Sequence, residues 1–200
     1  MPQTSDRYKT IQGKAQGLYK EKGSKFIALA FHVETEQEVK NRLLSVKKEF
    51  HDARHHCYAF RINPENEFFR SNDDGEPSGT AGKPILNQIL SAELFNVLIV
   101  VVRYFGGTKL GVPGLIRAYK TAARDALEHA NIVTSVITRT LELEFDYPLT
   151  NQVMRIIKEE HLTVLKQDFF TTCKLTLQVE RVQKEKVLKK FKSVIGLTVK

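Results

Sequence analysis

The 200 residues of this chain are enough for one large domain or two small ones, each with its own hydrophobic core. Hydrophobic residues make up 42% of the chain and charged residues 27%, as in ordinary soluble proteins, and the longest apolar run, residues 97–102, is far shorter than the ~18 residues of a membrane span. The net charge of +8, from 31 Lys and Arg against 23 Asp and Glu, is compatible with a nucleic-acid or ribosomal partner, although no segment forms a basic tail.

The start of the chain and its two cysteines indicate the compartment. Residues 1–7 are polar and lack the apolar core of a secretory signal, so we expect a cytoplasmic protein. Cys57 and Cys173 are far apart and form neither a Cys-x-x-Cys pair nor a disulfide framework. We therefore expect two reduced, buried thiols.

The first third of the chain predicts strands followed by a helix. Residues 9–20 and 24–33 have the composition of two strands, and Gly23 lies in the turn between them. Thr35 and Glu38 have the spacing of a capping box, which predicts that an amphipathic helix begins there. Its buried stripe is expected to be formed by apolar residues at helical spacing: Val39, Leu43, Leu44, Val46 and Phe50.

A third strand is expected over residues 54–62, with a short strand near Phe68, before two glycine-rich stretches at 73–82 and 103–114. These stretches hold seven of the eleven glycines, and each leads into a predicted helix. The run 97–102 between them is apolar on both faces, as a central strand would be. Glycine permits positive φ and close approach, and the first amides of a helix lack internal partners. We therefore expect the two stretches to form one surface for an anionic or hydrogen-bonding partner.

The pattern changes near residue 137. Residues 140–146 alternate between apolar and polar side chains, as in a half-exposed strand. A helix, two strands, a Lys-rich helix and a last strand are expected at 149–160, 162–168, 172–180, 182–192 and 196–199. This βαββαβ order is the ferredoxin-like pattern. The predicted fold class is α+β, with two domains at 1–136 and 137–200.

The glycine stretches do not match a standard nucleotide loop. A Walker A loop requires Gly where Pro77 stands and Ser or Thr where Pro84 stands, and residues 106–109 lack Gly-x-Gly-x-x-Gly spacing. Asp73, Asp74 and Glu76 would suit a divalent metal or a general base, but we favour a solvated turn because their spacing matches no metal loop.

His51, Asp52, His55, His56 and Cys57 resemble a metal cluster only in composition. In an extended strand His55 and Cys57 face one way and His56 the other, so half the cluster cannot reach one ion. We favour a structural role, or one histidine lining the site, and predict no metal and no cofactor.

Basic and aromatic residues around the second stretch allow two interpretations. Arg103, Lys109 and Arg117 could bind phosphates while Tyr104 or Tyr119 stacks on a base. Alternatively, the arginines pair with the acidic residues of the first stretch and rigidify both loops. The sequence favours neither.

Four segments together resemble the YigZ/IMPACT family: 53–59, 74–84, 101–111 and 114–119. The resemblance covers residues from about 20 to 130, and the remainder is similar to the small C-terminal domain of the bacterial members. One departure is Pro113, which stands where many relatives have glycine.

The resemblance implies an N-terminal domain like the second domain of ribosomal protein S5. It also implies a ferredoxin-like C-terminal domain similar to a late domain of elongation factor G. Both folds occur in the translation machinery. Eukaryotic relatives regulate translation by competing for a partner in an initiation-factor kinase pathway through a separate RWD domain. We do not carry that interaction over to this chain, which begins with the glycine-motif domain.

The function we expect is that of a translation-linked regulatory protein that binds RNA or the ribosome without catalysis. Lysines of the last helix would add electrostatic affinity: Lys184, Lys186, Lys189 and Lys190. The expected ligand site comprises one histidine and residues of both glycine stretches: His56, Asp74, Gly75, Glu76, Ser78, Gly79, Thr80, Gly82, Arg103, Tyr104, Gly106, Gly107, Lys109, Gly111, Gly114, Arg117 and Tyr119.

Two alternatives remain. The first is an enzyme for a small anionic or nucleotide-like substrate, with Asp74 or Glu76 as base or metal ligand, His56 as acid or base and Arg103 as anion clamp. The second is a surface that docks a regulatory protein.

Overall fold

The computed structural model describes residues 6–200, so the polar start at residues 1–5 lies outside the described residues. The described chain divides into two compact units, each a mixture of helices and strands: residues 8–135 make up one, and residues 136–200 together with residues 6–7 make up the other. The predicted two-domain α+β class is confirmed, and the expected boundary at residue 136 lies beside this division. Strands β1 (Arg7–Gln12) and β7 (Asn131–Val136) pair in a two-stranded sheet at the division.

The N-terminal unit is built on a five-stranded sheet in which every neighbouring pair is antiparallel. In spatial order its strands are β2 (Lys14–Glu21), β3 (Ser24–His32), β6 (Val97–Tyr104), β4 (His55–Ile62) and β5 (Phe68–Asn72). The central strand is β6, and its residues 97–103 are buried, as its two apolar faces predict.

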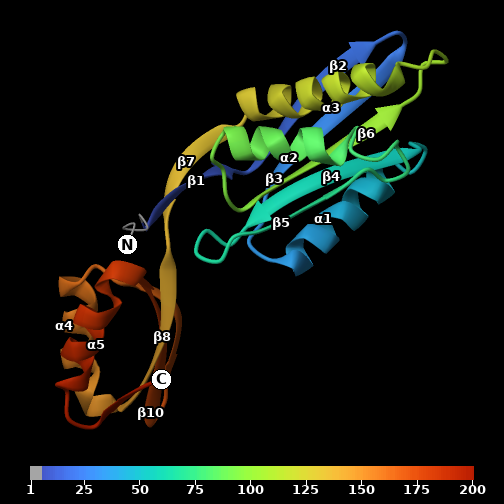
Figure 1. The fold of residues 1–200 in the computed structure, drawn as a ribbon. Helices are drawn as coiled ribbons and strands as arrows, with labels where there is room; N and C mark the ends of the chain where they lie inside the picture. The colour runs from blue at the N-terminus through green and yellow to red at the C-terminus, as the bar shows by residue number, and fades with distance from the viewer. Residues whose placement is uncertain (1–5) are drawn as a thin grey trace. The chain divides into compact units, whose positions relative to one another are not determined.

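Helices cover both faces of this sheet (Figure 1). Helices α2 (Gly82–Ser91) and α3 (Gly111–Glu128) lie together on one face, and α1 (Glu36–Glu49) lies on the other. Successive residues of β6 point to opposite faces, so Val101 joins the core beneath α2 and α3 while Val102 joins the core beneath α1. The loops that precede α2 and α3 therefore both lie over the first of these cores.

The predicted helix start is confirmed, because Thr35 Oγ1 accepts a hydrogen bond from the amide of Glu38 at 3.2 Å, although Glu38 Oε2 accepts in return from the amide of Glu34 and not from that of Thr35. Two details of the prediction were wrong. Gly13, with φ of +80°, divides the expected strand 9–20 into β1 and β2. Leu44, placed in the buried stripe of α1, is 68% exposed because it lies beyond the edge of the contact with the sheet.

The C-terminal unit has the predicted βαββαβ order. Its elements are β8 (Thr138–Asp146), α4 (Thr150–Glu159), β9 (Thr163–Phe169), β10 (Thr172–Glu180), α5 (Lys184–Lys192) and β11 (Leu197–Val199). The antiparallel sheet has the order β11-β8-β10-β9, and α4 and α5 pack on the same face of it. No helix within residues 6–200 is both long and apolar enough to cross a membrane.

Candidate functional site

The two glycine-rich stretches meet at a buried ion pair. Arg103, near the end of β6, donates from Nη1 to Glu76 Oε1 at 2.5 Å, and the Tyr119 hydroxyl on α3 donates to the same oxygen at 2.7 Å. The Arg103 and Glu76 side chains are only 7% and 4% exposed. Of the two interpretations of the arginines, the structure shows the pairing one for Arg103. This arginine is therefore not a free phosphate ligand.

Asp73 fixes the first stretch to the beginning of α2. Its Oδ1 accepts from the amides of Ala81 and Gly82, and its Oδ2 accepts from the amide of Gly79, all within 2.9 Å. Burial alone would raise the pKa of this carboxyl, but the three amide hydrogen bonds outweigh it and hold the pKa below its ordinary value. Asp73 therefore satisfies amides that would otherwise bind an anion, so the N-terminus of α2 is already occupied.

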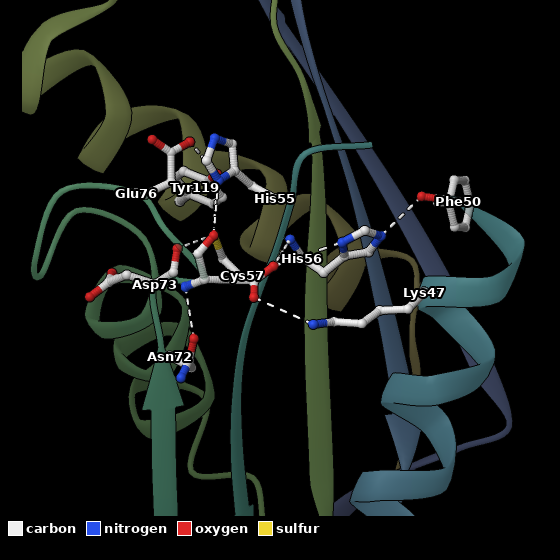
Figure 2. Close-up of polar contacts among 10 residues, drawn as sticks. Lys47, Phe50, His55, His56, Cys57, Asn72, Asp73, Glu76 and Tyr119 are labelled. Atoms are coloured by element: carbon white, nitrogen blue, oxygen red, sulfur yellow. Dashed lines mark hydrogen bonds and ion pairs between the residues drawn. The ribbon is translucent and has the colours of Figure 1, made fainter. Parts of the chain in front are cut away.

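Asp74 joins the first stretch to β4. One carboxylate oxygen accepts from the His56 amide at 2.7 Å, and the Asp74 carbonyl lies 2.9 Å from His55 Nδ1. Lys47 of α1 reaches the other carboxylate oxygen at 3.4 Å. His56 is buried, and its Nε2 lies 3.0 Å from the Phe50 carbonyl (Figure 2). Asp74 and His56 thus hold the scaffold together through these contacts.

Cys57 lies between the two stretches and is buried, as expected. Its thiol is 3.3 Å from the Tyr119 hydroxyl and 2.9 Å from the Asp73 carbonyl. Burial raises the pKa of Cys57 to about 12, and nearby carboxylates act in the same direction against the Tyr119 hydrogen bond. Burial therefore favours the protonated thiol at neutral pH, which is the less nucleophilic form. Within residues 6–200, no three His, Cys, Asp or Glu side chains converge in a way that could hold a metal ion.

The glycines shape the loops by the two means expected of them. A Cβ at Gly106 would lie 1.9 Å from the Gly23 carbonyl carbon, so the second loop packs against the β2–β3 turn as only glycine allows. Positive φ angles, between +70° and +88°, occur at four predicted site glycines: Gly75, Gly79, Gly107 and Gly111. Pro113 lies in the first turn of α3 and is not among the positive-φ residues, so the proline fits there without strain.

Three other predicted residues also serve the scaffold. Thr80 is buried and donates from its hydroxyl to the Pro77 carbonyl at 2.6 Å. Gly82 is the first residue of α2, where a Cβ would lie 2.7 Å from the Asn72 amide nitrogen. Gly114 lies in α3, where a Cβ would be 2.9 Å from Leu110 Cβ. Ser78 is exposed on the first loop.

A pocket of about 470 Å³ opens where the two loops and β4 meet. Three cationic groups, an exposed aromatic ring and the first turn of α3 contribute to its wall, and no side chain caps that turn. The lining residues are Arg54, His55, Glu76, Pro77, Arg103, Phe105, Lys109, Leu110, Gly111, Val112 and Leu115.

Two cations of this pocket are available to a ligand. Arg54 and Lys109 are exposed, and neither forms an ion pair with any residue of the described chain. Arg117, in contrast, is engaged by Glu21, whose hydrogen bond raises the pKa of the guanidinium, and it lies outside the pocket lining. The composition around the second stretch pointed to Lys109, but Arg54 was missed because it precedes β4, far away in sequence.

The expected stacking residues are both engaged elsewhere. Tyr119 is fully buried, and its ring packs edge-on against Phe26, so it presents no face to a base. Tyr104 donates its hydroxyl to Asp52 at 2.7 Å, which lowers the pKa of Asp52 and raises that of Tyr104. Phe105, between them in the chain, is 58% exposed at the pocket. An apolar ring inside a polar glycine loop was the signal that could have identified it.

The family model of the Impact N-terminal domain matches residues 22–127, which include both loops and the pocket. The chain belongs to the IMPACT family. IMPACT family member YvyE of Bacillus subtilis is 38% identical over 68% of this chain, and that match spans 63% of the length of YvyE. A Haemophilus influenzae IMPACT family member is 33% identical over 86% of this chain and 82% of its own length.

Solved structures extend the comparison of this IMPACT family chain. One crystal structure, described as that of a hypothetical protein, superposes with a TM-score of 0.75 at 26% identity and covers 96% of both chains. The two-domain translational regulator Yih1 is 28% identical, with a TM-score of 0.42, over 60% of this chain and 48% of its own.

Proposed function

We propose that this protein is a translation-linked regulator that binds single-stranded RNA, free or in the ribosome, through the pocket between the glycine loops. The link to translation comes from the similarity to Yih1, which is described as a two-domain translational regulator and is 28% identical to this chain. The observation that carries the binding step is the combination of exposed Phe105 with Arg54 and Lys109 around one pocket. A base can stack on the ring while the two cations meet flanking phosphates, which is how single strands are commonly bound.

The roles of the two loops follow from their contacts. Glu76 and Arg103 form an ion pair with each other and line the pocket. In this proposal they position the pocket rim, and other residues contact the ligand. Lys109 and Phe105 extend from the second loop, and Arg54 precedes the neighbouring strand. Catalysis forms no part of this proposal, because the buried Cys57 thiol is protonated and Asp73 is engaged by three amides.

The test is binding of a fluorescent single-stranded RNA, and of ribosomes, across a salt series. Arg54→Ala and Lys109→Ala should each weaken binding and reduce the slope of log K against log salt by about 0.7, the value for one phosphate contact on a single strand. Phe105→Ala should weaken binding with an unchanged slope, because stacking on an aromatic ring is worth about 1–3 kcal/mol per base and carries no charge.

The matched control is Lys40→Ala. Lys40 is an exposed lysine on α1, which covers the opposite face of the sheet, so this variant should bind like the wild type. Equal loss in Lys40→Ala and Lys109→Ala would show that overall charge, and not the pocket, determines binding. No RNA or ribosome binding at low salt would refute the proposal, and saturable thermal stabilisation by a small anion would then favour the enzymatic alternative.

A further inference from the structure

The strand β9 leaves one edge of the C-terminal sheet open. It has seven residues and pairs only with β10 within the described chain, whereas β11 at the opposite edge has three residues. Apolar side chains on and just after β9 are exposed: Leu165 is 53% exposed, Phe169 40% and Phe170 74%. A long, apolar edge strand is a template for another strand, which proteins usually shorten or cover.

The charged residues of β9 are complementary to those of a second, antiparallel copy of the same strand. Lys166 and Asp168 flank Gln167, and both point away from the helices, because they pair with the outward-facing residues Thr176 and Lys174 of β10. If two copies of β9 run antiparallel about a two-fold axis at Gln167, Lys166 of each copy lies opposite Asp168 of the other. The same register brings Phe169 of each copy near Leu165 of the other, the residue at which the pairing of β9 with β10 is irregular. Oppositely charged and apolar cross-strand pairs of this kind stabilise sheets.

We propose that β9 pairs with β9 of a second copy of this chain, joining the two four-stranded sheets into one antiparallel sheet of eight strands. The register is the one centred on Gln167. Moving the axis by one residue along the strand, to Lys166 or to Asp168, brings like charges directly opposite each other. The regular segment 166–169 sets this register, since the pairing with β10 shifts between Lys166 and Val164.

The first experiment is disulfide trapping with Gln167→Cys. Directly opposed residues of antiparallel strands have Cα atoms about 4.5–5.5 Å apart, within the range that a disulfide spans. The wild-type thiols Cys57 and Cys173 are buried, so they do not compete. Mild oxidation should yield a covalent dimer of Gln167→Cys. The matched control is Thr198→Cys, an exposed position in the middle of β11 at the other edge, which should form no disulfide-linked dimer under the same oxidation.

The second experiment tests the register by sedimentation of the full chain over a concentration series. Lys166→Asp should weaken the dimer at least about fivefold, because symmetry replaces two attractive pairs by two repulsive ones. The double variant Lys166→Asp with Asp168→Lys should restore wild-type association, and far-UV circular dichroism checks that each variant is folded. A wild-type chain that stays monomeric up to about 1 mM, a contact weaker than about 4 kcal/mol, would overturn the proposal. Dimerisation that the double variant fails to restore would overturn this register.

Discussion

Loss of Arg103 should destabilise the N-terminal unit strongly through Glu76. Arg103→Met keeps an unbranched apolar stem and removes the guanidinium, leaving a carboxylate that is 4% exposed with the Tyr119 hydroxyl as its remaining hydrogen-bond donor. Removing one member of a buried ion pair costs about 3–5 kcal/mol, because the other charge stays in a low dielectric. Arg103 Nε is itself buried without a partner, an unfavourable feature that the variant removes. We therefore expect about 3 kcal/mol, the lower end of the range.

The double variant Arg103→Met with Glu76→Gln isolates the cause. A neutral amide can still accept the Tyr119 hydrogen bond, so at least half of the lost free energy of unfolding should return. Urea unfolding followed by circular dichroism provides these values, with m-values compared to verify the same unfolding transition. The control is Arg124→Met, whose ion pair with Glu128 is about 60% exposed and should contribute less than about 1 kcal/mol. A loss below about 1 kcal/mol for Arg103→Met, or a double variant no more stable than the single one, would refute the reasoning.

Three further predictions concern the scaffold of the site. The pKa of Asp73 is lower in the folded state, so its ionised form stabilises the fold at pH values above its ordinary pKa of 3.8, and this stability is lost as the pH falls through the lower folded pKa. Asp73→Asn should therefore be about 1–3 kcal/mol less stable at pH 7, and its free energy of unfolding should change less with pH in the acid range. A shallow acid limb in the wild type would contradict this assignment. Gly106→Ala should lower the melting temperature far more than Gly107→Ala, because a Cβ meets backbone at 1.9 Å in the first case and open space in the second, where only a positive φ opposes it. Equal shifts would show that the loop can move away from the turn. Cys57 should resist iodoacetamide at pH 8 in the native protein and react after unfolding, since its pKa is about 12; rapid native labelling, followed by peptide mapping, would contradict the burial.

Sequence patterns predicted the elements whose cause is local. The apolar run within β6, the Thr35–Glu38 cap and the βαββαβ order each depend on periodicity or on contacts within a few residues. The break at Gly13 was missed because a glycine inside an alternating run is tolerated in strands, and only its φ of +80° marks the end of pairing. The exposure of Leu44 depends on how far the sheet extends beneath α1. The helical spacing of apolar residues carries no information about that extent.

The two glycine loops contact each other through Arg103 and Glu76, as one shared surface requires, but the ligand site and the roles of its residues remain proposals. The partner of Arg103 is 27 residues away in the chain, and sequence could not choose between that ion pair and a phosphate. Arg54 and Phe105 became candidates only once β4 and the second loop were placed around one pocket. Burial of Tyr119 likewise follows from the packing of α3, which depends on the whole unit.

One carboxylate oxygen, Glu76 Oε1, joins the loop before α2 to both β6 and α3. Because this contact already orders the pocket rim, the rim should lose little conformational entropy when a ligand binds. Binding should then resemble rigid-body docking more than the ordering of a flexible loop. Its association rate should follow ionic strength, through steering by the surrounding cations, and show little dependence on loop ordering. A change at Glu76 would then weaken binding indirectly, because Arg103 and Tyr119 would lose the carboxylate that holds them in place.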